Sequence, residues 1–421
     1  MFNRVRPYID LVSQNENYRR LWLSQVVSNF GDWFGILAVY ALITQYSQSE
    51  FLLGLIIVVK MMSLASFSPF AGYITDRFNR RRIMIMCDIS RAVLVSGLLL
   101  VGSYDTLWLA YVLTAVQMML SAIFEPAKTS SIPNVTTHDE LVDANVLSSA
   151  SWSFIFTMGM GIGGLATSWL GTNLVFIIDA ITYLLSAWFI FRTVIPQKEM
   201  DEAEFRRTRN PITGIKEGFQ YLLNNHQVLR PMLAKGSFTM FLGALTYMLI
   251  LVSNKVLLMG SFGLGLLYSA RGVGTGIGPV IGRRIFIRER DWVRAMGFCM
   301  IFGGLMYFVV GLTSSLTIMM IFVFTAHTAS GANWVMSTVL LQRRTPDMYR
   351  GRVFSSEWLF YTVAQSVSVL VASWILDNKF LSIQQAIMIF ALLLSLAGII
   401  WHLTVTAREN KYQQEKIVEH G

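Results

Sequence analysis

Twelve apolar stretches, each long enough to cross a lipid bilayer, fill this chain of 421 residues almost from end to end. A helix needs about 20 apolar residues to cross a hydrocarbon core of about 30 Å. The pattern therefore predicts an all-α membrane protein with 12 transmembrane helices. We place these helices at residues 20–44, 51–74, 82–102, 107–125, 146–169, 174–192, 232–253, 263–282, 293–312, 315–340, 353–376 and 383–406.

The charged residues support this assignment and orient it. Only 14% of the residues are charged, against about 25% in soluble domains, which leaves no room for a separate soluble domain. The first apolar run, from Leu21 to Thr44, is too long for a signal-peptide core, so we expect it to be retained as a helix. The chain has 34 Lys and Arg, and nearly all lie in gaps that would face the cytoplasm. The exceptions are Lys255, Lys379, Lys60, Arg91, Lys235 and Arg271.

Basic loops stay inside, so we expect both termini to lie on the cytoplasmic side of a bacterial cytoplasmic (inner) membrane. The net charge of +9 then reflects contact with lipid, and a nucleic-acid partner is not expected because no soluble basic surface is present. The longest polar stretch divides the helices six and six. We predict an N-terminal six-helix bundle over 1–192, a cytoplasmic linker over 193–230, a C-terminal six-helix bundle over 231–406 and a cytoplasmic tail over 407–421.

The linker contains a second structural signal. Asn210-Pro211 is a plausible cap followed by proline at the first helical position, and apolar residues then recur at helical spacing. This predicts an amphipathic helix lying on the cytoplasmic membrane surface. Glycine runs over 159–164 and 272–282 lie within apolar stretches, where small residues allow helices to approach closely.

The two halves of the chain carry matching basic gaps. The gap at 72–84 reads GYITDRFNRRRIM, and the gap at 278–296 reads GPVIGRRIFIRERDWVRAM. Such a repeat suggests two parallel halves related by an axis along the membrane normal. Transporters built in this way bind substrate near the midplane, where the repeats meet.

The first of these gaps resembles the cytoplasmic signature of the major facilitator superfamily, Gly-x-x-x-Asp-Arg-x-Gly-Arg-Arg/Lys. The matching residues start at Gly72 and include Asp76, Arg77, Arg80 and Arg81. The resemblance implies the major facilitator fold, transport by alternating access and a cytoplasmic gate at this motif. Asn79 stands where the family usually has glycine, and we expect it to keep the turn because Asn tolerates a left-handed backbone.

Other segments are similar to the drug/proton antiporter branch of the superfamily, which includes macrolide efflux pumps and the enterobactin exporter. Some of them also resemble the bacterial lysophospholipid transporter. These segments are 17–25, 28–33, 124–128, 141–145, 178–180 and 345–353. The resemblance implies efflux of drug-like or amphiphilic small molecules, or of a siderophore, and leaves lysophospholipid transport as the alternative.

Asp32 is the strongest candidate for ion coupling. It lies twelve residues after Arg20, about 18 Å along a helix and so near the middle of the bilayer. A charge at this depth costs about 2.5–3.5 kcal/mol on insertion scales, so its presence suggests a function. A carboxyl group withdrawn from water can bind and release a proton near neutral pH. The alternative is a helix-cap or packing role beside Gly31.

Three further charged or titratable residues are candidates on other helices. Arg271 could bind an anionic substrate group or act as a counter-ion to a carboxylate, with a fixed structural pair as the alternative. His327 could join a proton relay. Lys60 is a cavity candidate, although extension of its long side chain to the membrane surface is the favoured interpretation.

The gate prediction rests on charges near the cytoplasmic ends of the helices. Asp88 and Arg91 are three residues apart, share a helix face and can pair beside the motif. The predicted gate residues are Gly72, Asp76, Arg77, Arg80, Arg81, Asp88, Arg91, Glu125, Lys128, Arg352 and Glu357. Asp179 is a family feature with no visible proton partner. Substrate-cavity candidates are polar or aromatic residues, each of which could equally be packing: Asn29, Trp33, Lys60, Gln117, Phe238, Phe241, Tyr247, Asn333, Trp334, Tyr361 and Gln365.

The sequence favours secondary transport over enzymatic or nucleotide-driven function. It has no ATP-binding motif, and its five His are scattered, so a membrane-embedded enzyme is not expected. The two cysteines, Cys87 and Cys299, predict buried thiols and no metal site. We expect a monomer without a cofactor, whose partners are a small-molecule substrate, protons (or Na⁺) and the lipid bilayer. A non-transporting receptor of the same architecture is left open.

Overall fold

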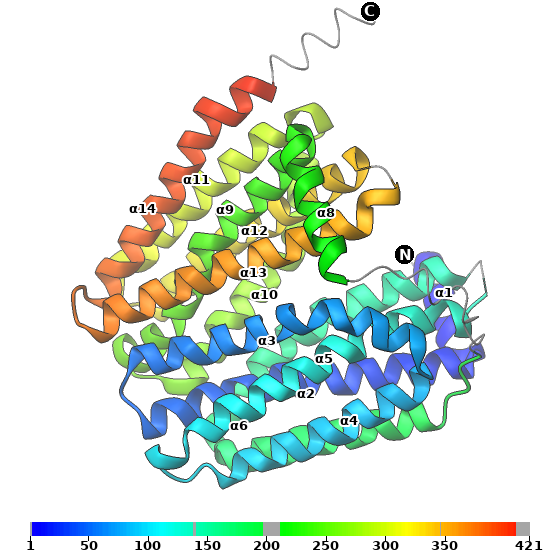
Figure 1. Ribbon diagram of the computed structural model, residues 1–421. Helices are drawn as coiled ribbons and strands as arrows, with labels where there is room; N and C mark the ends of the chain where they lie inside the picture. Colours follow the sequence, from blue (N-terminus) through cyan, green and yellow to red (C-terminus); the bar gives the residue numbers. More distant parts are fainter. Residues whose placement is uncertain (1, 138–139, 197–210, 346, 410–421) are drawn as a thin grey trace, which may run out of the picture. The chain divides into compact units, whose positions relative to one another are not determined.

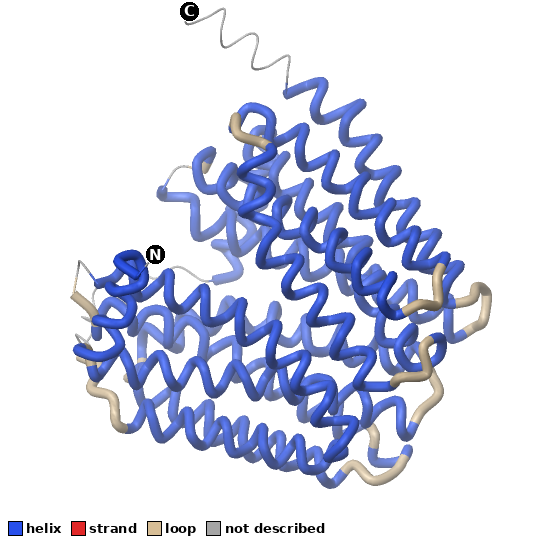
Figure 2. Tube along the Cα trace, turned by 180° about the vertical axis from the view of Figure 1, so that it is seen from behind, coloured by secondary structure: helices blue, strands red, loops and turns tan. Residues whose placement is uncertain are grey.

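The computed structural model describes residues 2–137, 140–196, 211–345 and 347–409. Within these residues it contains helices and loops and no strand (Figures 1 and 2). The all-α prediction is therefore confirmed. The chain divides into two compact units, which we call unit 1 (Met1–Gln48 and Ile56–Ile212) and unit 2 (Ser49–Leu55 and Thr213–Gly421). Residues 197–210 of the predicted linker and the tail from 410 onward lie outside the described residues.

Unit 1 is a bundle in which α6 runs along α2 and α4, and α4 also packs on α5 (Figure 1). Its helices are α1 (Phe2–Gln14), α2 (Glu16–Tyr46), most of α3 (Glu50–Arg77), α4 (Arg80–Gly97), α5 (Trp108–Val135) and α6 (Glu140–Phe191). Short 3-10 turns, η1 (Leu98–Leu100) and η2 (Tyr104–Thr106), connect α4 to α5.

The long helix α6 is bent at one glycine. Its 52 residues include Gly171, whose φ of 76° and ψ of 169° are not helical. A positive φ of this size is readily adopted only by glycine, because a Cβ atom would clash with the backbone. The bend lies between the two apolar stretches from which spans were predicted at 146–169 and 174–192.

Unit 2 contains a second bundle, in which α10 packs on α12, α11 packs on α14, and α9 packs on α13 (Figure 1). Where α10 and α12 meet, a Cβ atom added to Gly278 would lie 2.3 Å from the carbonyl oxygen of Thr328, so this close approach requires glycine. Its elements are α8 (Pro211–Asn224), α9 (His226–Leu251), η3 (Val252–Val256), α10 (Gly260–Ile285), η4 (Glu289–Asp291), α11 (Trp292–Leu312), α12 (Leu316–Arg344), α13 (Asp347–Asp377), α14 (Ile383–Trp401) and η5 (His402–Thr406).

Ten helices among the described residues are long and apolar enough to cross a membrane. The predicted number of 12 differs for two physical reasons. The bent α6 counts as one helix although it holds two predicted spans. In α10, Arg271 and many glycines lower the mean hydropathy of a helix that is 26 residues long.

Asparagine side chains start two helices of unit 1. The side chain of Asn15 accepts a hydrogen bond from the backbone N–H of Tyr18, at 3.0 Å. Asn79 caps α4 in the same way, accepting from the N–H of Arg82 at 3.1 Å. Its φ of −64° and ψ of 112° are extended, so the expectation of a left-handed turn at Asn79 was wrong. At this position the chain uses Asn as an N-cap, which satisfies an otherwise free amide.

The amphipathic helix predicted in the linker is present as α8, and it begins at Pro211 as expected. The proposed cap, Asn210, lies outside the described residues. Leu222 of α8 is buried with Val228 and Met232 of α9, and Phe219 packs against the same cluster. This apolar face therefore packs against α9 within unit 2.

Helix α1 was not predicted from the sequence. Its Leu11 is buried in a cluster with Tyr18, Phe124 and other residues of unit 1. Because α1 is too short and too polar to span a bilayer, hydropathy alone gave no signal for it.

Candidate functional site

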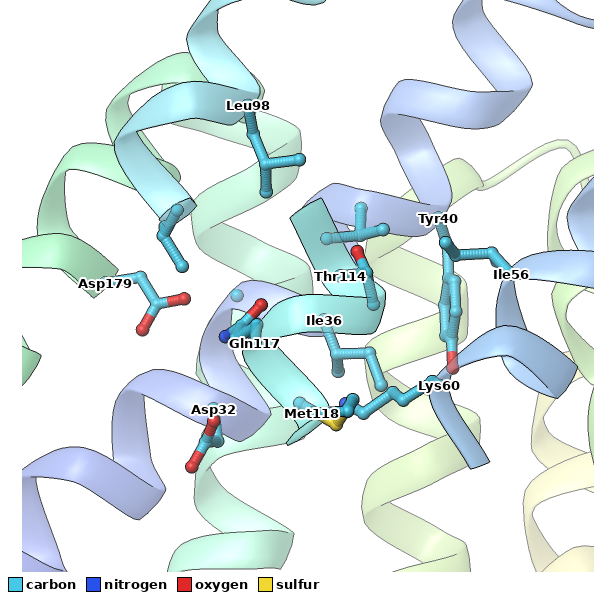
Figure 3. Close-up of a pocket in the computed structure, with 13 residues that line it drawn as sticks. Asp32, Ile36, Tyr40, Ile56, Lys60, Leu98, Thr114, Gln117, Met118 and Asp179 are labelled. Atoms are coloured by element: carbon cyan, nitrogen blue, oxygen red, sulfur yellow. The ribbon is translucent and has the colours of Figure 1, made fainter. Parts of the chain in front are cut away.

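A pocket inside unit 1 brings together acidic, basic and amide side chains from several helices (Figure 3). The space between these side chains, counted together with adjoining open solvent, is about 420 Å³. Most of the lining is aliphatic, with a few polar groups, as is usual for small-molecule sites. The lining residues are Asp32, Gly35, Ile36, Val39, Tyr40, Ile56, Lys60, Val95, Leu98, Thr114, Gln117, Met118 and Asp179.

Asp32 of α2 is held by a short chain of hydrogen bonds. The hydroxyl of Tyr183 donates to Oδ1 of Asp32 at 2.5 Å, and the amide Nε2 of Gln117 donates to the same hydroxyl at 2.8 Å. The hydroxyl proton of Tyr183 is therefore directed at the carboxyl group of Asp32. The structure thus brings the predicted residues Asp32 and Gln117 together through Tyr183, which was not predicted from the sequence.

Asp179 of α6 lines the same pocket and is only 4% exposed. The hydroxyl of Thr182 bonds to Oδ1 of Asp179 at 3.4 Å. A Cβ atom added to Gly35 would lie 2.4 Å from Oδ2 of Asp179, so α2 must have glycine here for the carboxyl group to fit. The structure thus brings a second carboxyl group to the site of Asp32, which the sequence did not indicate.

Lys60 of α3 also lines the pocket, and its ammonium group lies 5.9 Å from the ring centre of Trp33. It lies within electrostatic reach of both Asp32 and Asp179. Figure 3 shows its side chain running along the pocket beside Met118. This placement favours the cavity interpretation of Lys60 over extension to the membrane surface.

The predicted pair of Asp88 and Arg91 is present on α4 and lies in the interior of unit 1. Arg91 is 2% exposed and Asp88 is 0% exposed. The hydroxyl of Ser186 donates to the second oxygen of Asp88 at 2.6 Å. The guanidinium of Arg91 lies 4.6 Å from the ring centre of Tyr183 and 4.3 Å from that of Phe124. The pair therefore contacts the tyrosine that binds Asp32.

Other predicted gate residues bond to helix ends within their own unit. Arg80 donates to the carbonyl of Ser130 at 2.9 Å, and Arg81 donates to the carbonyls of Ile190 and Phe191 at the end of α6. The contact of Arg81 places a positive charge at the C-terminal end of α6, where it is favourable. Lys128 pairs with Glu125 one turn away, at 2.7 Å. The side chains of Gly72, Asp76, Arg77 and Arg352 lie outside the described part of the chain.

In unit 2, Glu357 forms a buried pair with Lys235 at 2.9 Å, and each side chain is 6% exposed. Lys235 also donates to Thr338 at 3.0 Å, and its ammonium lies 3.6 Å from the ring centre of Trp334. Tyr361 packs edge-on against Trp334, with ring centres 5.6 Å apart. Of the predicted cavity residues, Trp334 thus covers a lysine of its own unit, and Tyr361 packs on Trp334.

In His327, also in unit 2, the Nε2 atom lies 2.9 Å from the hydroxyl oxygen of Tyr307. Arg271 lies over the ring of Tyr268, with 5.3 Å to the ring centre, and is within electrostatic reach of His327. Tyr247 and Asn333 are buried, whereas Phe241 and Gln365 are partly exposed. In unit 1, Asn29 is buried, and Trp33 packs edge-on against Phe156 with ring centres 4.6 Å apart, outside the pocket lining.

Comparison with known proteins decides the family. The model of the Major Facilitator Superfamily matches residues 21–368. The chain belongs to the major facilitator superfamily. The "Uncharacterized MFS-type transporter YfiS" of Bacillus subtilis (strain 168) is 27% identical over 372 residues, which cover 84% of this chain and 86% of the relative. The "Putative bacilysin exporter BacE" of Bacillus amyloliquefaciens is 25% identical, covering 80% of this chain and 84% of that protein.

Two further similarities are informative. The "Lysophospholipid transporter LplT" of Pectobacterium carotovorum subsp. carotovorum (strain PC1) is 27% identical over 169 residues, 40% of each chain. A bacterial homologue of the human lysosomal transporter Spinster, solved in an inward-facing and unoccupied conformation, has a TM-score of 0.72 and 16% identity, and the match covers 94% of this chain and 98% of that one. This superfamily member is therefore a multi-pass membrane protein with the predicted fold class.

Proposed function

We propose that this protein is a secondary active transporter that exports a small molecule across the bacterial cytoplasmic membrane in exchange for protons. The observation that carries the proposal is the carboxyl group of Asp32, which lies in the pocket of unit 1 and accepts a hydrogen bond from Tyr183. Alternating access then exposes this carboxyl group first to one side of the membrane and then to the other. Protons enter as the substrate leaves.

The charge balance around Asp32 supports proton exchange. Asp32, Asp179 and Asp88 supply three acidic groups, while Lys60 and Arg91 supply two basic groups. With all five ionised, the cluster carries one net negative charge. A net charge inside a bilayer is costly, so binding of one proton or of one positive ligand group is favourable. A carboxyl group that can hold either one is what antiport requires.

Similarity supports the direction of transport. Relatives named as exporters match most of this chain, and the segments resembling the drug/proton antiporter branch include Asp32 itself. We therefore assign Asp32 the leading role in coupling, with Tyr183 and Gln117 orienting its carboxyl group. Arg271 and His327 of unit 2 are assigned an accessory coupling role, and the motif around Asp76 together with its predicted partners is assigned the cytoplasmic gate. We further propose a monomer with both termini in the cytoplasm.

Lysophospholipid transport is the second candidate function. It is favoured by the similarity to LplT, which covers 40% of this chain. In that case, labelled lysophospholipid would cross the membrane, and a proton gradient would not be discharged by drug-like compounds.

The test uses the full chain in liposomes with a pH-sensitive dye trapped inside. Cationic drugs, a catechol siderophore and lysophospholipid are added in turn. We expect at least one compound to drive proton movement in the wild type, and Asp32→Asn to abolish it. Asp105→Asn is the matched control, because Asp105 is an exposed acid in η2 outside the pocket. Proton movement that persists in Asp32→Asn would refute the coupling role.

A further inference from the structure

Three polar groups of the unit 1 pocket are not needed for a proton to bind at Asp32. These are the second carboxyl group, on Asp179, the ammonium group of Lys60 and the hydroxyl of Thr114. They come from three different helices, α6, α3 and α5. A pocket built for a proton alone would need none of them, because each adds a polar group to an otherwise aliphatic lining.

Thr114 gives independent support for a bound ligand. Its side chain lines the pocket and it is only 4% exposed. Its hydroxyl oxygen has no hydrogen-bond partner among the residues that the structure describes. Leaving a buried hydroxyl without a partner costs about 1–3 kcal/mol, so such groups are usually satisfied by something. A polar group of a bound molecule would satisfy it.

Asp179 and Lys60 present opposite charges to the same space. Among the bonds that the described residues show, the carboxyl group of Asp179 has only a 3.4 Å contact with the hydroxyl of Thr182, which also donates to the backbone carbonyl of Asp179 at 2.7 Å. Its carboxyl group faces α2 through the space that Gly35 leaves open. Lys60 enters from α3 and lies within electrostatic reach of this carboxyl group. One wall of the pocket is therefore acidic and another is basic.

We infer that this pocket binds a small zwitterion, with its ammonium group on Asp179 and its carboxylate on Lys60, and with Thr114 bonding to a polar group between them. The inference rests on the proposed function, in that Asp32 is kept for the proton. The chemical class is that of an amino acid or a short peptide.

Ligands with only one charge fit this arrangement less well. A simple cation would pair with Asp179 but would place a like charge near Lys60. A simple anion would pair with Lys60 but would face Asp179 and Asp32. Like charges at short distance inside a low-dielectric pocket are strongly unfavourable, so the lysine and the acids together select against both.

The experiment measures binding to the purified full chain in detergent, without a proton gradient. The probes are phenylalanine and alanyl-phenylalanine, the C-terminal amide of each, and the N-acetyl form of each. We expect at least one zwitterion to bind tenfold or more tightly than its amide and its N-acetyl form. Lys60→Met should remove the preference over the amide, and Asp179→Asn should remove the preference over the N-acetyl form.

Matched variants separate charge from folding. Lys60→Arg keeps the charge and should keep the preference, whereas Lys216→Met removes an exposed charge of α8 and should change nothing. The inference is overturned if the wild type binds no zwitterion of the panel, or binds the amides or N-acetyl forms equally well, a result that needs no variant. It is also overturned if Lys60→Met folds and keeps the full preference.

The outcome is distinguishable from failure of the proposed function. Zwitterion preference in this assay, together with no proton movement when the same zwitterion is added to the liposomes, would refute proton coupling but would still support the inferred ligand class. Proton movement driven only by singly charged compounds would support proton coupling and refute the inferred zwitterion class.

Discussion

The two units deal with buried charge in different ways. In unit 2, Lys235 and Glu357 form a one-to-one pair whose charges cancel, with Trp334 over the ammonium group. In unit 1, the group around the pocket has one acid more than it has bases, and three of its members line open space. The first arrangement is complete without a ligand, whereas the second is completed by a proton or by a positively charged group.

This difference shows where a membrane protein can place a group whose charge changes during transport. A buried charge whose partner is removed costs several kcal/mol, so a closed pair holds its helices together. A carboxyl group that accepts one hydrogen bond and faces a pocket can change its charge at a smaller cost. Burial alone therefore does not mark a functional residue; the balance of charge around it does.

The largest expected effect breaks the closed pair of unit 2. Glu357→Gln leaves Lys235 buried without an acidic partner, and we expect the free energy of unfolding to fall by about 3–5 kcal/mol. The double variant Lys235→Met with Glu357→Met should recover most of this loss. Thermal unfolding of the purified protein measures both. Equal stability of Glu357→Gln and the wild type would show that the pair does not stabilise the fold.

The next prediction tests the group of charged residues around the pocket of unit 1. Tyr183→Phe removes the hydrogen bond to Asp32, and bonds to charged groups contribute about 1.5–3 kcal/mol. We expect proton-coupled transport to fall by about tenfold to a hundredfold at this energy, with a smaller change in unfolding temperature than Glu357→Gln produces. Tyr104→Phe is the control, because Tyr104 is an exposed residue of η2 outside the pocket lining. Equal loss in both variants would refute a specific role for Tyr183.

A steric change tests whether transport depends on the position of Asp179 in the pocket of unit 1. Gly35→Ala would place a methyl group 2.4 Å from Oδ2 of Asp179, so the carboxyl group must move. Such overpacking costs about 1–3 kcal/mol, and we expect transport to fall with it. Asp179→Ala introduced into Gly35→Ala should recover stability but not transport. If Gly35→Ala transports normally, the position of Asp179 does not matter.

The smallest expected effect lies away from both groups of charge. Gly171→Ala forces a Cβ atom into the backbone conformation of the bend in α6, at a cost of about 1–2 kcal/mol. No side chain or backbone atom lies within 4 Å of that Cβ, so the cost is purely conformational. We expect lower stability in thermal unfolding with transport retained. Loss of transport would show that the bend itself is needed for function.

Local features could be predicted from the sequence, because they depend on spacing along one helix. The pair of Asp88 and Arg91 followed from their separation of three residues. Asn79 was misjudged because the family pattern suggested a turn where the chain has an N-cap.

Contacts between distant residues could not be predicted. Lys235 and Glu357 are 122 residues apart, and Tyr183 is 151 residues from Asp32. One signal was present and was not used: Asp179 and Tyr183 are four residues apart, so they share a helix face. Placing Tyr183 beside a proton site would still have required knowing that α6 packs along α2.

The most direct test measures proton release when substrate binds to the purified protein in weakly buffered detergent solution. The substrate is the compound that drives proton movement in liposomes. The account predicts proton release from the wild type and from the double variant Lys235→Met with Glu357→Met, and none from Asp32→Asn. Release that persists in Asp32→Asn and disappears in the double variant would contradict the account and place coupling in unit 2.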